Sequence, residues 1–196
     1  NTERDGVEPM EESGGGILAV WGSPGCGKTV TAVKIAKHLA AQKKNTALLL
    51  CDMTAPMMPC ICPPSELEVD KSLGSIFAAQ RISVNLIKHN LTTLKRLPHL
   101  TMLGLRKKEN EYTYAPCTKQ QAEELIRGLR EIVPYVVIDC SSYIANDILS
   151  AVALMEADSV LQLASCDLKS VGYLSSQLPL LGELKWNKDK QYRVAS

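Results

Sequence analysis

The chain has 196 residues, of which 45% are apolar and 22% are charged, and this balance allows one sizeable buried core. Its formal net charge of +1 gives no support for nucleic-acid binding, which usually needs a clustered basic excess. No apolar stretch reaches the roughly 18 residues that a membrane-spanning helix requires, so we expect a cytoplasmic protein without a transmembrane segment.

Residues 1–16 are predicted to be a flexible lead, because they are acidic and end in Ser13-Gly14-Gly15-Gly16. A secretory signal peptide would instead have basic residues followed by an apolar run. The sequence starts without Met and stops soon after the last predicted strand. We therefore expect a piece of a longer protein, in which residues 17–196 form one domain that lacks its C-terminal end.

The first predicted elements are a strand, a helix and a second strand. Residues 17–21 form a short apolar run that ends at a glycine, as buried strands do. Residues 29–43 repeat apolar side chains at helical spacing, with lysines on the other face. Residues 46–51 predict a second buried strand, and the Pro-rich residues 53–64 are expected to be irregular.

The rest of the chain continues to alternate between helical and strand patterns. The predicted elements are helices at 71–79 and 82–89, a strand at 100–105, a helix at 119–133, a strand at 135–139, a helix at 146–156, a strand at 159–163, a helix at 168–181 and a short strand at 192–195. This alternation predicts an α/β fold, in which helices cover both faces of a parallel, doubly wound sheet.

A phosphate-binding loop lies between the first predicted strand and the first predicted helix. Its residues match the pattern G-x-x-x-x-G-K-[ST] and, with the residue that follows, are expected to bind nucleotide: Gly22, Ser23, Pro24, Gly25, Cys26, Gly27, Lys28, Thr29 and Val30. Backbone amides would surround the phosphates, Lys28 would reach the β- and γ-phosphates, and Thr29 would bind Mg²⁺. The alternative is a glycine turn with an incidental Lys-Thr.

Two aspartates end predicted strands, at the edge of the sheet where ligands bind. Asp139 is expected to hold the magnesium shell with Thr29, although an Asp at a strand end also caps turns. Asp52 is expected to orient or activate the attacking water, and its alternative role is to cap the Pro-rich loop. We therefore predict ATP and Mg²⁺ as cofactors, with Lys28 and Asp52 as the catalytic residues.

Seven cysteines, several of them in buried segments, favour reduced thiols over a disulfide framework. The pair Cys60 and Cys62 has the only close spacing, and a zinc site would need further paired ligands nearby. The alternative is that both are ordinary loop or buried cysteines.

Together these motifs resemble the ParA/MinD family of P-loop ATPases, within the SIMIBI class, over roughly Gly16 to Leu181. The segments that carry the resemblance are residues 17–43, the Leu-Leu-Leu-Cys-Asp sequence that ends at Asp52, residues 135–142 and residues 156–161. The resemblance implies that the strand bearing Asp139 lies beside the phosphate-loop strand. It also implies that ATP drives dimerisation, that hydrolysis reverses it, and that the protein positions plasmids, chromosomes, division sites, or pilus and secretion machinery.

Ser23 departs from the family pattern, which has at this position a lysine that reaches the partner's nucleotide. The departure puts the cross-dimer contact in doubt, and it makes the sequence look closer to the atypical TadZ/CpaE-like pilus-localisation branch. A second departure is the early end of the chain, which is expected to leave out the residues that recognise the base.

Three functions are consistent with these residues. The leading hypothesis is a slow ATPase switch that dimerises with ATP and organises a partner complex, such as pilus, secretion, partition or conjugation machinery. The second is a tyrosine kinase of the related bacterial type, although its terminal tyrosine cluster is missing. The third is a module that binds nucleotide without significant hydrolysis. Residues 53–64 and 106–114 are expected either to contact the partner or to be plain connections.

Overall fold

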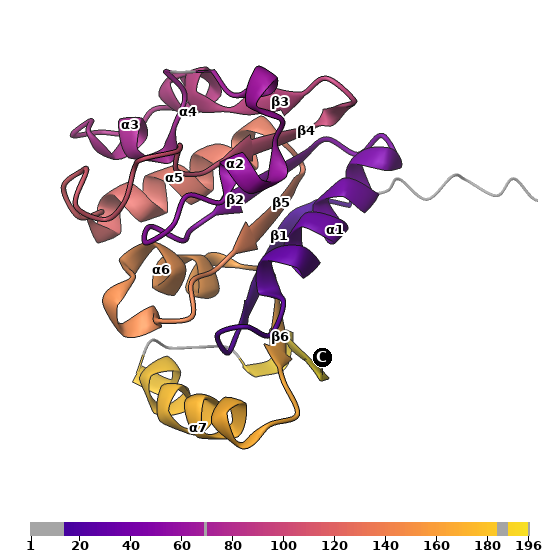
Figure 1. Cartoon of the computed structure of the whole chain (residues 1–196), viewed down its shortest axis with the longest axis vertical. Coiled ribbons are helices and arrows are strands. Elements are labelled where there is room, and N and C mark those ends of the chain that lie inside the picture. Colours follow the sequence, from indigo (N-terminus) through magenta and orange to yellow (C-terminus); the bar gives the residue numbers. More distant parts are fainter. Residues whose placement is uncertain (1–13, 69, 184–187, 196) are drawn as a thin grey trace, which may run out of the picture.

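A seven-stranded sheet organises the chain in the computed structural model, which describes residues 14–68, 70–183 and 188–195 (Figure 1). The strands lie in the order β3-β4-β2-β5-β1-β6-β7, and all neighbours are parallel except β3 and β4. Their bounds are β1 Gly16–Gly22, β2 Thr46–Leu50, β3 Thr92–Leu94, β4 Leu97–Leu103, β5 Tyr135–Asp139, β6 Ser159–Ala164 and β7 Gln191–Ala195. The α/β fold predicted from the sequence is confirmed.

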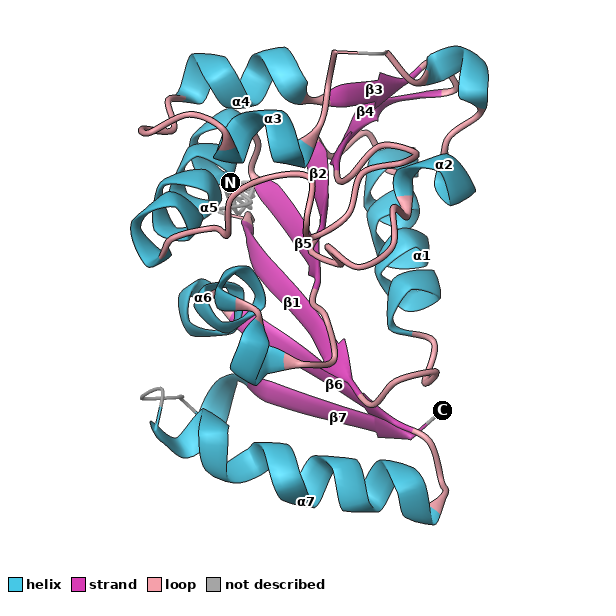
Figure 2. Cartoon of the chain, turned by 60° about the vertical axis from the view of Figure 1, so that its left-hand side comes forward, coloured by secondary structure: helices cyan, strands magenta, loops and turns pink. Residues whose placement is uncertain are grey.

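Helices cover both faces of this sheet, with α1 on one side and α5 and α6 on the other (Figure 2). The α-helices are α1 Lys28–Ala41, α2 Met58–Ile61, α3 Leu73–Phe77, α4 Val84–Asn90, α5 Lys119–Ile132, α6 Ile148–Glu156 and α7 Leu168–Glu183. Short 3₁₀ turns are η1 Pro64–Glu66, η2 Ile144–Asn146 and η3 Lys188–Lys190. None of the helices within the described ranges is both long enough and apolar enough to cross a bilayer.

Strand alternation divides the core into two halves. In β1, Ala19 and Trp21 face the half formed with α3 to α6, whereas Val20 faces the half formed with α1. Every residue of β2 is buried, as expected for a strand covered on both faces. Helix α5 begins with a capping box between Thr118 and Gln121, which satisfies free amides of its first turn.

The structure corrects two expectations. The edge strand β3 is antiparallel to β4 and was not predicted, because three residues are too few to show an alternating pattern. Residues 53–64 are not wholly irregular, because they contain the one-turn helix α2. Pro59 lies in the first turn of that helix, where no backbone N–H is needed, and buried Met58 anchors it to the core.

The carboxyl ends of the parallel strands meet at one edge of the sheet, and the strand order decides which loops become neighbours there. β5 lies between β1 and β2, and Asp139 is in register with Val20 on one side and with Leu50 on the other. The loops that follow β1, β2 and β5 therefore converge. As the family resemblance implied, the strand that carries Asp139 lies beside the phosphate-loop strand.

Candidate functional site

The phosphate loop depends on three glycines. Gly25 and Gly27 have φ angles of 77° and 82°, which side-chain-bearing residues rarely adopt. A Cβ on either residue would meet nothing within 4 Å, so glycine is favoured there by the backbone angle and not by lack of space. Gly22 is needed for another reason, because a Cβ there would lie 2.0 Å from the carbonyl oxygen of Leu163 on β6. The loop therefore has the shape of an anion-binding cradle at the start of α1.

The Lys28 ammonium lies against the loop and has two acceptors. Its Nζ donates to the backbone oxygen of Ser23 at 3.3 Å and to Ser142 Oγ at 2.5 Å. Lys28 is the first residue of α1, so the free amides and positive end of the helix face the same place as the ammonium. These groups together favour a bound polyanion.

Thr29 and Asp139 form a pair that the strand order brings together. Thr29 Oγ1 donates to Asp139 Oδ2 at 2.6 Å. Asp139 Oδ1 is buried without a hydrogen-bond partner, an arrangement that costs free energy unless a cation or a water completes it. Burial raises the pKa of Asp139 to about 6, against the opposing effects of Thr29 and Lys28, and the charge of Asp52 adds to the rise.

The Thr29 and Asp139 oxygens fit a magnesium ion, which prefers hard oxygen ligands. A hydroxyl that donates its proton still has lone pairs for a cation. Within the residues that the structure describes, no group of three or more His, Cys, Asp or Glu side chains could hold a metal ion by itself. An ion at this position would therefore depend on phosphate and water oxygens for its other ligands, as Mg²⁺ commonly does.

Asp52 caps the loop that follows β2. Its Oδ1 accepts hydrogen bonds from Thr54 N at 2.8 Å, from Thr54 Oγ1 at 2.6 Å and from Ala55 N at 3.3 Å. The capping role that the sequence offered as an alternative is thus present. Asp52 also lines the cavity that contains Lys28 and Thr29, so capping and a role at the site are compatible.

A cavity of about 550 Å³ joins these groups. It lies at the carboxyl edge of the sheet and is bounded by the phosphate loop and by the loops after β2, β4 and β5. The lining residues are Pro24, Gly25, Lys28, Thr29, Asp52, Met53, Thr54, Glu111, Asp139, Cys140, Ser141, Ser142, Tyr143, Asn146 and Asp147. Its size is within the range of small-molecule sites.

Residues 18–192 match the profile of a protein family described as an AAA domain. The chain belongs to this family. A comparison of this chain with curated protein sequences finds no match. The ParA/MinD-like P-loop fold expected from the motifs is confirmed by the family match together with solved structures that share the fold.

Three solved structures resemble this chain, and because their sequence identities are low, the resemblance shows only a shared fold. The ParA family ATPase from Chlorobium tepidum has a TM-score of 0.71 and 15% identity, over 93% of this chain and 74% of that one. MinD from Pyrococcus horikoshii, complexed with Mg-ADP, has a TM-score of 0.65 and 13% identity, over 90% of this chain and 67% of that one. The kinase domain of the Escherichia coli tyrosine kinase ETK has a TM-score of 0.68 and 14% identity, over 95% of this chain and 71% of that one.

In the AAA domain, Ser23 points inward at the position where the family resemblance expects an outward-reaching lysine. It is only 1% exposed, and its hydroxyl lies 2.7 Å from Ser170 Oγ in the first turn of α7. The residue thus packs inside the molecule. Neither Ser170 nor Ser142 was singled out in the sequence, because serines give no motif signal and both reach the phosphate loop only through the fold.

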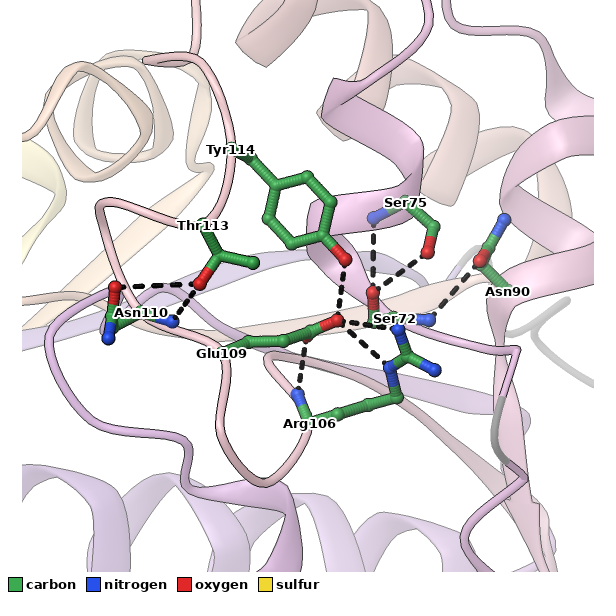
Figure 3. Close-up of polar contacts among 8 residues, drawn as sticks. All are labelled: Ser72, Ser75, Asn90, Arg106, Glu109, Asn110, Thr113 and Tyr114. Carbon is green, nitrogen blue, oxygen red and sulfur yellow. Dashed lines mark hydrogen bonds and ion pairs between the residues drawn. The ribbon is translucent and has the colours of Figure 1, made fainter.

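The loop after β4 is held by the buried carboxylate of Glu109 (Figure 3). It also brings a second carboxylate to the cavity. Glu109, 6% exposed, accepts from the guanidinium of Arg106 at 2.7 and 2.9 Å and from Tyr114 Oη at 2.6 Å. Burial pushes the pKa of Glu109 upward, but these hydrogen bonds outweigh burial and lower it. Glu111, two residues further on, lines the cavity. From the sequence, residues 106–114 were expected either to contact a partner or to be a plain connection, and a place in the cavity wall was not expected.

The two closely spaced cysteines lie in different surroundings. Cys60 is exposed, whereas Cys62 is buried and its thiol contacts Met102 Sδ at 3.6 Å. Burial raises the pKa of Cys62 to about 11, so this thiol stays protonated near neutral pH. All seven cysteines lie in the described part of the chain, and each is a free thiol.

Proposed function

We propose that this AAA domain binds Mg-ATP and hydrolyses its γ-phosphate slowly, as a molecular switch of the ParA/MinD type. The observation that carries the proposal is the glycine loop at the cavity wall beside the Thr29–Asp139 pair, in which the buried Asp139 Oδ1 has no hydrogen-bond partner. A cradle of amides fits phosphates, and the oxygen pair next to it fits the cation that accompanies them.

Each residue has an assigned role in this proposal. The backbone of Gly22 to Val30 holds the phosphates, and Lys28 contacts the β- and γ-phosphates. Thr29 and Asp139 hold Mg²⁺, which supplies positive charge to the phosphate oxygens when it is bound. The MinD structure from Pyrococcus horikoshii, solved with Mg-ADP, supports the choice of cofactor.

Asp52 is assigned to the attacking water. The three hydrogen bonds that it accepts all go to Oδ1, so Oδ2 is the oxygen that we assign to orienting or activating the water. The capping contacts then have a second use, because they hold the carboxylate in place for its role at the cavity.

The switch is proposed to act in the cytoplasm and to organise a partner complex, with dimerisation controlled by nucleotide. Free thiols at all seven cysteines support a reducing compartment. The inward-facing Ser23 supports a place among the atypical TadZ/CpaE-like members, in which the lysine contact across the dimer is relaxed. The partner would be pilus, secretion, partition or conjugation machinery, and residues 53–64 and 106–114 are proposed to contact it.

Two other functions remain candidates. The fold shared with the ETK kinase domain favours a tyrosine kinase, which would leave phosphotyrosine on the protein after incubation with Mg-ATP, detectable by mass spectrometry. A nucleotide-binding module without significant hydrolysis would bind Mg-ATP but release no phosphate, even at high protein concentration and with candidate partners added.

The test compares ATP turnover of the wild type with that of Lys28→Ala, with and without Mg²⁺. We expect magnesium-dependent phosphate release that falls at least about 100-fold in Lys28→Ala, because removing a preorganised donor to a developing charge costs that much. The control is Lys34→Ala, which removes an exposed lysine of the same helix. Wild-type turnover in Lys28→Ala would refute the assigned mechanism.

Self-association is tested by measuring molecular mass with ATP and with ADP. A shift from monomer to dimer with ATP alone supports the switch. A monomer that is indifferent to ATP supports the binding module instead.

A further inference from the structure

Ser142, in the loop after β5, links Lys28 to the phosphate-loop backbone. Its hydroxyl donates to the backbone oxygen of Gly22 at 3.1 Å and accepts from Lys28 Nζ at 2.5 Å. A hydroxyl has one proton to donate. Since that proton is directed at Gly22, the oxygen is left as an acceptor aimed at the ammonium.

Tyr173 of α7 fixes the backbone that carries this hydroxyl. Its Oη donates to the backbone oxygen of Ser142, and its ring packs against buried Trp21 with the ring centres 6.2 Å apart. Burial raises the pKa of Tyr173 to about 12, so the phenol keeps the proton that it donates throughout the physiological range. Trp21 directly precedes Gly22, so the ring packs at the start of the phosphate loop.

A second contact joins the same face of α7 to the loop. Ser170 lies three residues before Tyr173, a spacing that places both on one side of a helix, and its hydroxyl lies 2.7 Å from that of Ser23. The backbone N–H of Ser170 donates to Asp167 Oδ1 at 2.7 Å, which anchors the first turn of α7. The two residues that supply acceptors to Lys28, Ser23 and Ser142, are therefore both hydrogen-bonded to α7.

We propose that Ser142 and Tyr173 are positioning residues for Lys28, and that α7 thereby controls how well the ammonium is placed for the phosphates of the nucleotide. The inference rests on the proposed function, because in that function Lys28 binds the phosphates of the nucleotide. A lysine side chain has several rotatable bonds, and holding it in place before binding removes an entropy cost that the nucleotide would otherwise bear. A displacement of α7 would release both acceptors together, which links this helix to the affinity of the site.

The first test measures the affinity for Mg-ADP by calorimetry. Ser142→Ala and Tyr173→Phe are each expected to weaken binding about threefold to tenfold, the effect of one immobilised side chain set free. Ser175→Ala and Tyr192→Phe are the controls, because they remove exposed hydroxyls of α7 and β7 and should bind like the wild type. Unchanged or tighter binding by Ser142→Ala would overturn the proposal.

The double variant separates positioning from general damage to the fold. If Tyr173 acts through Ser142, adding Tyr173→Phe to Ser142→Ala should weaken binding little further. Additive losses would mean that Tyr173 has a separate structural effect and would overturn its role as a positioning residue. Trp186→Phe leaves Trp21 as the sole tryptophan, so its emission reports whether the buried ring next to the loop is undisturbed in each variant.

A third arm needs no nucleotide. Acetic anhydride labels lysine amines, and the rate at Lys28, read by peptide mass spectrometry, should rise in Ser142→Ala and Tyr173→Phe relative to the rate at exposed Lys34. An unchanged labelling rate at Lys28 would overturn the positioning role. Faster labelling in a protein that binds no Mg-ADP would instead refute the proposed function and leave the contact between α7 and Lys28 standing.

Discussion

Asp139→Asn should make the protein more stable at neutral pH, in the absence of metal and nucleotide. The folded-state pKa of Asp139 is raised from 3.8 to about 6, chiefly by burial. Between these two values the folded state binds more protons than the unfolded state, so the free energy of unfolding falls as the pH rises through that window. Asparagine escapes this effect because it carries no charge, and it keeps an oxygen that can accept from Thr29.

The size of the gain follows from the shift. A rise of this size corresponds to about 3 kcal/mol at pH 7.5 and to about half of that at pH 5, where much of the folded-state carboxyl is protonated. Urea denaturation in EDTA at the two pH values, compared between wild type and Asp139→Asn, measures both numbers. The reasoning fails if the variant is less stable than the wild type at pH 7.5, or if its advantage is the same at pH 5. In the presence of Mg-ATP the same substitution should abolish turnover, because it removes a proposed magnesium ligand.

Further substitutions test other parts of the fold by the same denaturation assay. Asp158→Asn should have the opposite pH behaviour, because hydrogen bonds from the amide of Ile17 and from Arg130 outweigh burial and lower the pKa of Asp158; its loss of stability should grow as the pH rises through the lowered pKa, and a loss that is constant with pH would contradict this. Gly74→Ala should cost about 1–3 kcal/mol, since the new Cβ would lie 2.0 Å from the Tyr114 ring. Gly172→Ala is its matched control, because a Cβ there meets nothing within 4 Å, and it should stabilise α7 by up to about 1 kcal/mol; equal effects of the two alanines would refute the packing argument.

Local sequence signals predicted most of the architecture. Short apolar runs gave β1, β2 and β5 because strands buried on both faces need no alternation, and the helical repeat of Ala122, Leu125, Ile126 and Leu129 gave α5. The two differences from the predicted elements concern short segments. The two segments are the one-turn helix Met58–Ile61 and the three-residue strand Thr92–Leu94. Each is too short to show a periodic pattern of apolar residues, so its conformation is decided by the residues that pack around it.

The phosphate loop could be predicted from the sequence alone, because its glycines, lysine and threonine all lie in the short run from Gly22 to Thr29. The sequence also marked Asp139 and Asp52 as strand-end carboxylates. Other features of the site became visible only in the folded chain. Ser142 contacts Lys28, and Tyr173 contacts the backbone of Ser142. Glu111 lines the cavity, and Ser23 is buried. Those contacts depend on the order of strands in the sheet and on the docking of α7, which bring together residues more than 100 positions apart and which no local pattern encodes.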